Sequence, residues 1–159
     1  MTAKPPGRLI AVELDETIGR GPSPEAEHER ATAIYDLIED NRFQLSNGMA
    51  GPYHLILSTH EGRLVLDVRD PAQHPLMAFG LSLTPFRRIV KDYFQICDSY
   101  YEAIRSSSPQ QIETVDMARR GLHNEGSEIL MERLSGKVKT DLDTARRLFT
   151  LVCALVWKG

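Results

Sequence analysis

Hydrophobic and polar residues alternate through much of the first half of the chain, which is the pattern of strands with one buried face. In RLVLDVRD, Leu64, Leu66 and Val68 alternate with mostly polar residues, and PLMAFGLSL has the same period. The pattern predicts five strands, at residues 8–14, 42–45, 53–59, 63–70 and 75–83. Short turns join the later strands, with His-Glu-Gly at 60–62 as a hairpin signal, so we expect a small antiparallel sheet.

A helix is expected between the first two strands, because Ser23 is a suitable N-cap and Pro24 a suitable first helical residue. Its apolar positions fall on one side: Ala31, Ile34, Tyr35 and Ile38. The other side is acidic, with Glu25, Glu27, Glu29, Asp36, Glu39 and Asp40. We interpret that acidic side as a solvated surface.

From Thr84 onward the hydrophobic period becomes helical. Thr84 is the expected cap and Pro85 the first turn of a helix that reaches Arg105. Its seam is Phe86, Val90, Tyr93, Cys97, Tyr100 and Ile104, widened by Phe94 and Tyr101. An aromatic stripe at this spacing is typical of a packed core rather than of a ligand pocket.

Two further helices are expected. The first spans about 109–135 and ends at Gly136, and Gly121 and Gly126 each weaken it by roughly 1 kcal/mol relative to alanine. It either continues through or breaks near His123, with Asn124 capping the second part. The last helix, 142–157, follows Asp141 as its cap. Its inward positions are Ala145, Leu148, Phe149, Val152 and Val156.

The expected fold class is therefore α+β, in a single domain that spans residues 1–159. A sheet-rich part, 8–83, holds the five strands and one N-terminal helix, and a helical part, 84–157, holds three to four helices. Small residues, Ala78, Gly80 and Ser82, share one face of the strand at 75–83 and leave room for close approach. Packing within the chain is the expected cause, and the same face is a candidate surface for a homodimer.

Composition is that of an ordinary globular chain: 42% hydrophobic, 26% charged and net charge −3. An acidic chain lacks the basic footprint of a nucleic-acid binder. Residues 1–70 nevertheless carry net −5 and residues 71–159 net +2, which permits a local anion site. We expect Cys97 and Cys153 to be buried, reduced thiols, and the chain has neither a signal-peptide core nor a membrane-length apolar run. We therefore expect a cytoplasmic protein without membrane contact.

Arginine pairs are the most distinctive feature of the helical part. The motif Asp-x-Ala-Arg-Arg occurs at 116–120 and again at 143–147, and each aspartate can reach its own arginines, three or four residues on. One interpretation is two salt-bridged helix surfaces. The other is a shared anion site, because the planar guanidinium suits carboxylates and phosphates. The candidate binding residues are Arg119, Arg120, Arg146, Arg147, Arg87 and Arg88.

His123, Asn124 and Glu125 form the most enzyme-like triplet. A histidine titrates near neutral pH and a carboxylate can orient it, so His123 and Glu125 are candidates for a general acid and base. Adjacent helical residues point about 100° apart, however, which speaks against this pair acting together. A hydrogen-bonded helix junction is the simpler interpretation.

Cofactor and metal signatures are missing from the sequence. The five histidines are dispersed, and no zinc or calcium spacing occurs. No phosphate-binding loop and no dinucleotide-binding glycine motif occurs either. We therefore expect no cofactor and no metal site.

The segments LTPFRRIVKDYFQICDSYYEAIR, DMARRGLHNEGSEIL, DTARRLFTLVCAL and GPYHLIL resemble an uncharacterised protein family of alphaproteobacteria. The resemblance covers about residues 8–156. That family has no assigned activity, cofactor or catalytic residue, so the resemblance implies none.

The sequence therefore favours a non-enzymatic, cytoplasmic interaction or regulatory module. Its arginine pairs would bind an acidic protein partner or a small anionic ligand. The alternative is a small hydrolase or transferase that acts on a phosphorylated metabolite, with the arginines as a phosphate clamp and His123 or Glu125 as acid or base. Homodimerisation is compatible with both.

Overall fold

The computed structural model describes residues 7–156, which form four helices and six strands. The strands are β1 (Leu9–Leu14), β2 (Phe43–Leu45), β3 (Tyr53–His60), β4 (Arg63–Arg69), β5 (Pro75–Ser82) and β6 (Val138–Thr140). The helices are α1 (Pro24–Glu39), α2 (Thr84–Ser106), α3 (Pro109–Leu134) and α4 (Leu142–Val156). The α+β class is confirmed, with three of the four helices in the C-terminal half. Trp157, assigned to the last helix from the sequence, lies outside the described residues.

The main sheet has four strands in the order β1-β3-β4-β5. The hairpin of β3 and β4 is confirmed, and its two turn residues, Glu61 and Gly62, both have positive φ angles of 50° and 76°. The expectation of a wholly antiparallel sheet was wrong, because β1 pairs with β3 in parallel. Helix α1 lies between β1 and β3 in the chain. The connection through this helix returns the chain to the end of the sheet where β1 starts, so that β3 can run parallel to β1.

The strand predicted at 42–45 lies outside the main sheet, which corrects the five-stranded sheet expected from the sequence. As β2 it pairs antiparallel with β6, and Leu45 lies opposite Val138. Strand β6 was not predicted, because its three residues lie in the short connection between two predicted helices and only their pairing with β2 marks them as a strand. This small ladder ties the end of α1 to the segment that enters α4.

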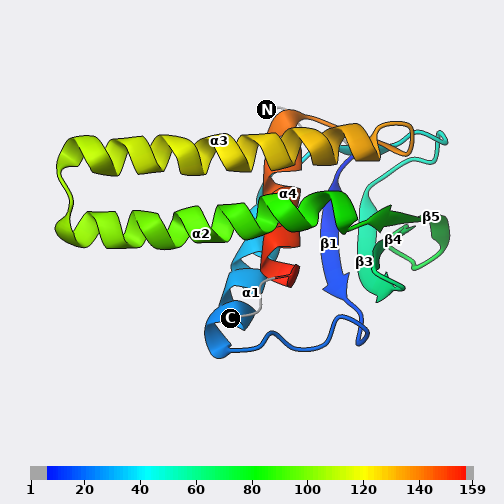
Figure 1. Ribbon diagram of the computed structural model, residues 1–159. Coiled ribbons are helices and arrows are strands. Elements are labelled where there is room, and N and C mark those ends of the chain that lie inside the picture. The colour runs from blue at the N-terminus through cyan, green and yellow to red at the C-terminus, as the bar shows by residue number, and fades with distance from the viewer. Residues whose placement is uncertain (1–6, 157–159) are drawn as a thin grey trace.

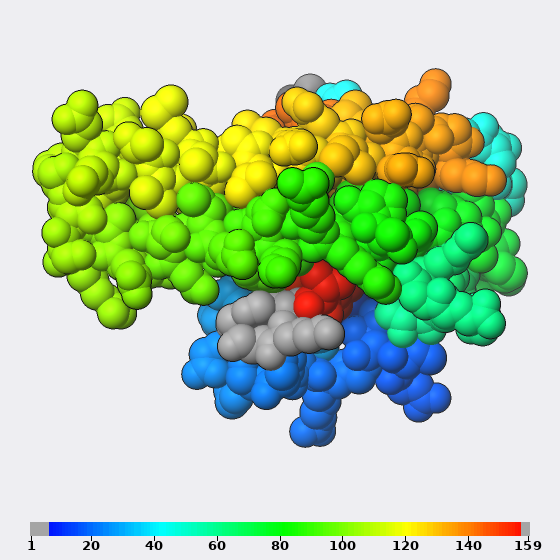
Figure 2. Space-filling view, in the orientation of Figure 1, coloured from blue at the N-terminus to red at the C-terminus, as the bar shows by residue number. Residues whose placement is uncertain are grey.

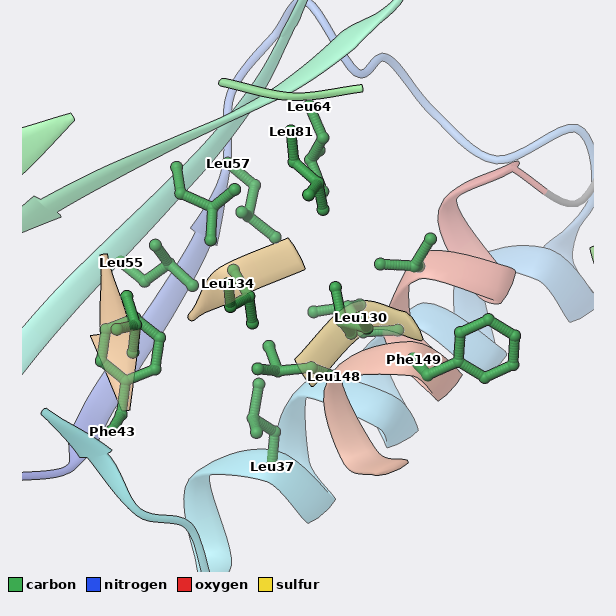
Figure 3. Close-up of a cluster of buried hydrophobic side chains, with 14 of the residues drawn as sticks. Leu37, Phe43, Leu55, Leu57, Leu64, Leu81, Leu130, Leu134, Leu148 and Phe149 are labelled. Atoms are coloured by element: carbon green, nitrogen blue, oxygen red, sulfur yellow. The ribbon is translucent and has the colours of Figure 1, made fainter. Parts of the chain in front are cut away.

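One face of the main sheet is the core face. Alternate residues of β3 and β4 are buried there: Leu55, Leu57, Leu64, Leu66 and Val68. Figure 3 shows Leu55, Leu57 and Leu64 of the sheet together with side chains from the helices, among them Leu130 and Leu148. The opposite face is open, and Ala78 and Gly80 of β5 are exposed. The expectation that this small-residue face packs within the chain was therefore wrong.

Helix starts follow local sequence with one exception. The Ser23 side chain accepts a hydrogen bond from the Ala26 N–H at 3.1 Å, and Asp141 accepts one from the Thr144 N–H at 2.8 Å, so both predicted caps are confirmed. Thr84 is not a cap, because it is already helical and Leu83 precedes it without a side-chain bond.

Helices α2 and α3 form an antiparallel hairpin that projects well beyond the rest of the molecule (Figures 1 and 2). We call its outer part, residues 96–119, the arm. Helix α3 is continuous through His123, so the expected break with Asn124 as a cap does not occur. At about 1.5 Å per residue, its 26 residues extend roughly 39 Å.

The aromatic seam of α2 is core only near the body. Phe86 and Val90 are buried, whereas Ile104 is 50% exposed and Tyr101 63% exposed. The seam continues as a helical pattern beyond the point where α4 covers it, so the prediction of a fully packed stripe was wrong for the arm. Of the apolar residues in the arm, only Ala103 is fully buried.

Candidate functional site

Arg119 and Arg120 share one carboxylate on α3. Arg119 Nη2 lies 2.6 Å from Asp116 Oδ1, and Arg120 Nε lies 3.1 Å from Asp116 Oδ2. The hydrogen bond from Arg119 lowers the pKa of Asp116, and the charge of Arg120 lowers it further. The predicted ion pair of this motif is therefore present, and two positive charges face one negative charge.

Arg119 also reaches across the hairpin to α2. Its guanidinium carbon lies 5.2 Å from the centre of the Tyr100 ring, within the range of a cation–π contact. This contact and the ion pair with Asp116 fix the direction of the guanidinium. Arg119 is thus held at the base of the arm, one helical turn from His123.

His123 lies against the ring of Phe149 from α4 and the ring of Tyr93 from α2, with centroids 5.2 Å and 5.5 Å away. Its Nε2 lies 2.8 Å from Thr150 Oγ1, and that hydroxyl donates to the Arg146 carbonyl at 3.0 Å. Because the hydroxyl proton is used there, the histidine is the donor to Thr150, with its proton on Nε2.

Burial lowers the pKa of His123 to about 4, with further contributions from the positive charges of Arg146 and Arg119. The imidazole is therefore neutral at pH 7. Both arginines act on the same ring, one from α3 and the other from α4. This brings together two of the six arginines that the sequence singled out.

Helix α4 supplies most of the surface pocket beside His123. The pocket measures about 340 Å³ and is lined by His123, Asp143, Arg146, Arg147 and Thr150. The expected pairing of Asp143 with Arg146 or Arg147 is not found among residues 7–156. Arg147 instead lies 3.9 Å from Asp40 at the end of α1. Arg146 forms no salt bridge within the described part of the chain.

Arg87 and Arg88 lie apart from this pocket, near the start of α2. Arg88 Nε is 3.9 Å from Asp92 on the same helix. Arg87 lines a separate hollow of about 960 Å³, together with Arg20 and Lys91, and this hollow shares no residue with the His123 pocket. The six arginines therefore form no single cluster.

Glu125 is exposed, and as the second residue after His123 on a helix it lies on the far side of α3 from the imidazole. The His123–Glu125 acid–base pair considered from the sequence is therefore not assembled. Thr150 was missed, because a lone threonine in a helical pattern carries no signal until its neighbours across the helix interface are known.

No group of three or more metal-binding side chains occurs among the described residues. Cys97 is half-buried and Cys153 buried, and both are free thiols. Burial raises the pKa of each, so neither is an activated thiolate. No helix within residues 7–156 is both long and apolar enough to cross a bilayer.

Comparison with known proteins gives a family but no activity. The model of an uncharacterised protein family, UPF0262, matches residues 6–158. A UPF0262 protein of Mesorhizobium japonicum is 61% identical over 153 residues, covering 96% of this chain and 94% of the relative. One from Agrobacterium fabrum is 59% identical, covering 96% of each. No solved structure matches. The chain therefore belongs to the uncharacterised protein family UPF0262.

Proposed function

We propose that the protein is a non-enzymatic interaction module that binds an acidic partner or a small anionic ligand at the pocket beside His123. The observation that carries this proposal is Arg146, an exposed arginine in that pocket without a salt bridge among residues 7–156. An unpaired guanidinium at a concave surface is free to form a two-pronged contact with a carboxylate or a phosphate.

Arg119 supports the same proposal from the other side of the histidine. Its charge and that of Arg146 both depress the pKa of His123, so the imidazole lies in a positive potential. A neutral imidazole in such a position does not repel an anion, and the arginines supply the positive charge. The two free cysteines are consistent with action in the cytoplasm.

The alternative, a hydrolase or transferase acting on a phosphorylated metabolite, is favoured by the position of His123 in a pocket next to arginines. Two features weaken it. A general base works best with a pKa near the working pH, whereas that of His123 is about 4. Its Nε2 is also engaged with Thr150, and no carboxylate partner orients it within the described residues.

Binding is tested by titrating the protein with inorganic phosphate and with a polyglutamate peptide while the His123 ring is followed by NMR. An anion bound at Arg146 in this pocket cancels part of the charge of that arginine, so the pKa of His123 should rise from about 4. The Arg146→Glu variant should lose this response. Arg88→Glu, an equal charge change outside the pocket, should retain it.

An unchanged His123 resonance with both anions contradicts the proposal. A response to phosphate alone points to a small ligand, and a response to the peptide alone points to an acidic protein surface. Turnover of phosphate monoesters by the wild type that is lost in the His123→Gln variant would establish the enzymatic alternative instead.

A further inference from the structure

Strand β5 is an edge of the main sheet, because the strand order ends with it. The hairpin turn decides which of its backbone groups point outward. In a two-residue turn, the flanking residues His60 and Arg63 exchange both backbone hydrogen bonds. The bonds then alternate along β4, so that Leu64, Leu66 and Val68 bond to β5.

The partners of those three residues in β5 are Leu81, Phe79 and Met77. The alternate residues of β5 therefore direct their N–H and C=O groups away from the sheet. These residues are Leu76, Ala78, Gly80 and Ser82. One of these groups is occupied, because Asn47 donates to the Leu76 carbonyl at 3.1 Å. The outward backbone groups of Ala78 and Gly80 have no partner among the described residues.

No charged residue, proline or bulge protects the central part of this edge, over residues 77–82. The segment PLMAFGLS carries no charged residue, and its only ladder irregularity lies at the Pro75 end, opposite Arg69. Edge strands of monomeric proteins commonly carry lysine, proline or a central bulge that prevents pairing. At the other edge, by contrast, the backbone of Leu9 in β1 is paired with a side chain. Asn41 accepts a hydrogen bond from the Leu9 N–H and donates one to the Leu9 C=O.

We propose that β5 pairs antiparallel with β5 of a second copy of this chain, joining two four-stranded sheets into one. The outward groups repeat every second residue and are identical in both copies, so a twofold axis beside Phe79 satisfies them. In that register Ala78 of each copy exchanges hydrogen bonds with Gly80 of the other. The two Phe79 residues then face each other as a close, non-hydrogen-bonded pair.

The small side chains of the open face suit this arrangement. Arg63 of β4 extends over Gly80, since a Cβ at that glycine would lie 3.4 Å from Arg63 Cδ. In the dimer, Arg63 of one copy therefore lies next to residue 78 of the other. Within its own chain, residue 78 lies opposite Asp67 of β4, whose carboxylate already accepts hydrogen bonds from Arg69 at 2.8 and 3.1 Å. Because that pair is already neutralised, the effect of a charge placed at residue 78 is decided by Arg63 across the interface.

Three variants of the full chain, one of them a control, test the proposal by light scattering after gel filtration. Wild type should have twice the chain mass. Ala78→Lys should be monomeric, because the lysine meets Arg63 of the other copy, whereas Ala78→Glu should remain dimeric. Ala31→Lys, the same change on exposed α1, should also remain dimeric.

Amide hydrogen exchange identifies the surface independently. In wild type, the outward amides of Ala78 and Gly80 should be protected by roughly a hundredfold, and in Ala78→Lys that of Gly80 should lose protection. The inward amides of Phe79 and Leu81 should stay protected in both, which shows that the sheet remains folded. A monomeric wild type, a dimeric Ala78→Lys variant, or unprotected outward amides in a dimer would each overturn the proposal.

Discussion

At the scale of single residues, the protonation state of His123 is decided by its neighbours. Its pKa of about 4 in the folded protein compares with about 6.5 in an unfolded chain. As the pH falls below 6.5, the unfolded state takes up the proton first, so the free energy of unfolding decreases until about pH 4 and is level below. We expect this histidine to account for a loss of about 3 kcal/mol over that window.

The contribution is isolated by urea unfolding of wild type and His123→Gln at a series of pH values. Glutamine can still donate to Thr150 but does not titrate, so the difference between the two free energies should change between pH 6.5 and 4. Asn124→Gln, a change on the exposed side of the same helix that removes no titrating group, should give a constant difference. A constant difference for His123→Gln as well would show that the imidazole is not held neutral.

Residues whose role depends on near neighbours in sequence were predictable, and those that depend on another helix were not. Ser23 and Asp141 cap helices through bonds to residues three positions on, which the sequence displays directly. Arg146 was predicted to pair with Asp143, yet the fold leaves it without a salt bridge among residues 7–156. Spacing shows that two helical side chains can meet, but not that they do.

At the scale of secondary-structure elements, the two glycines of α3 have opposite roles. Gly121 has open space where a Cβ would lie, so Gly121→Ala should raise the free energy of unfolding by about 1 kcal/mol through helix propensity alone. At Gly126 the new Cβ would lie 2.7 Å from Phe149 Cε2 and closer still to two other ring carbons. Gly126→Ala should therefore lower the free energy of unfolding by about 2 kcal/mol.

Each variant is the control for the other, because the same methyl group enters the same helix five positions apart. Urea unfolding at pH 7 gives both values. If both substitutions stabilise the protein, Phe149 is not packed on Gly126. Packing also explains why α3 continues through a glycine-weakened stretch: contact with the Phe149 ring there outweighs the low helix propensity that suggested a break.

At the scale of the whole molecule, element types were easier to predict than their partners. Alternation located β3, β4 and β5 to within a residue or two, because a half-buried strand displays its period locally. Parallel pairing of β1 with β3 depends on the path of the chain through α1, and β2 finds its partner about a hundred residues later in β6. Neither relation is encoded in the period of the strands involved.

The projection of the arm was likewise not predictable from the local hydrophobic period. Helical periodicity in α2 continues without change from the buried Phe86 to the exposed Tyr101, although α4 covers only the inner part. Within the arm, the helices are held mainly by each other, by the Arg119–Tyr100 contact and by the capping box between Ser108 and Gln111. We therefore expect the arm to open without unfolding of the body.

Amide hydrogen exchange at pH 7 measures this difference. Amides in the outer turns of α2 and α3 should exchange at least about a hundredfold faster than those of α4, which is buried mainly against α3 and α1. Ser108→Ala should accelerate exchange in the arm by roughly fivefold, since the loss of an N-cap costs about 1 kcal/mol, and leave α4 unchanged. Equal acceleration in α4 would mean that arm and body unfold as one unit. If the arm opens separately, the sheet and α4 keep their packing while it does so.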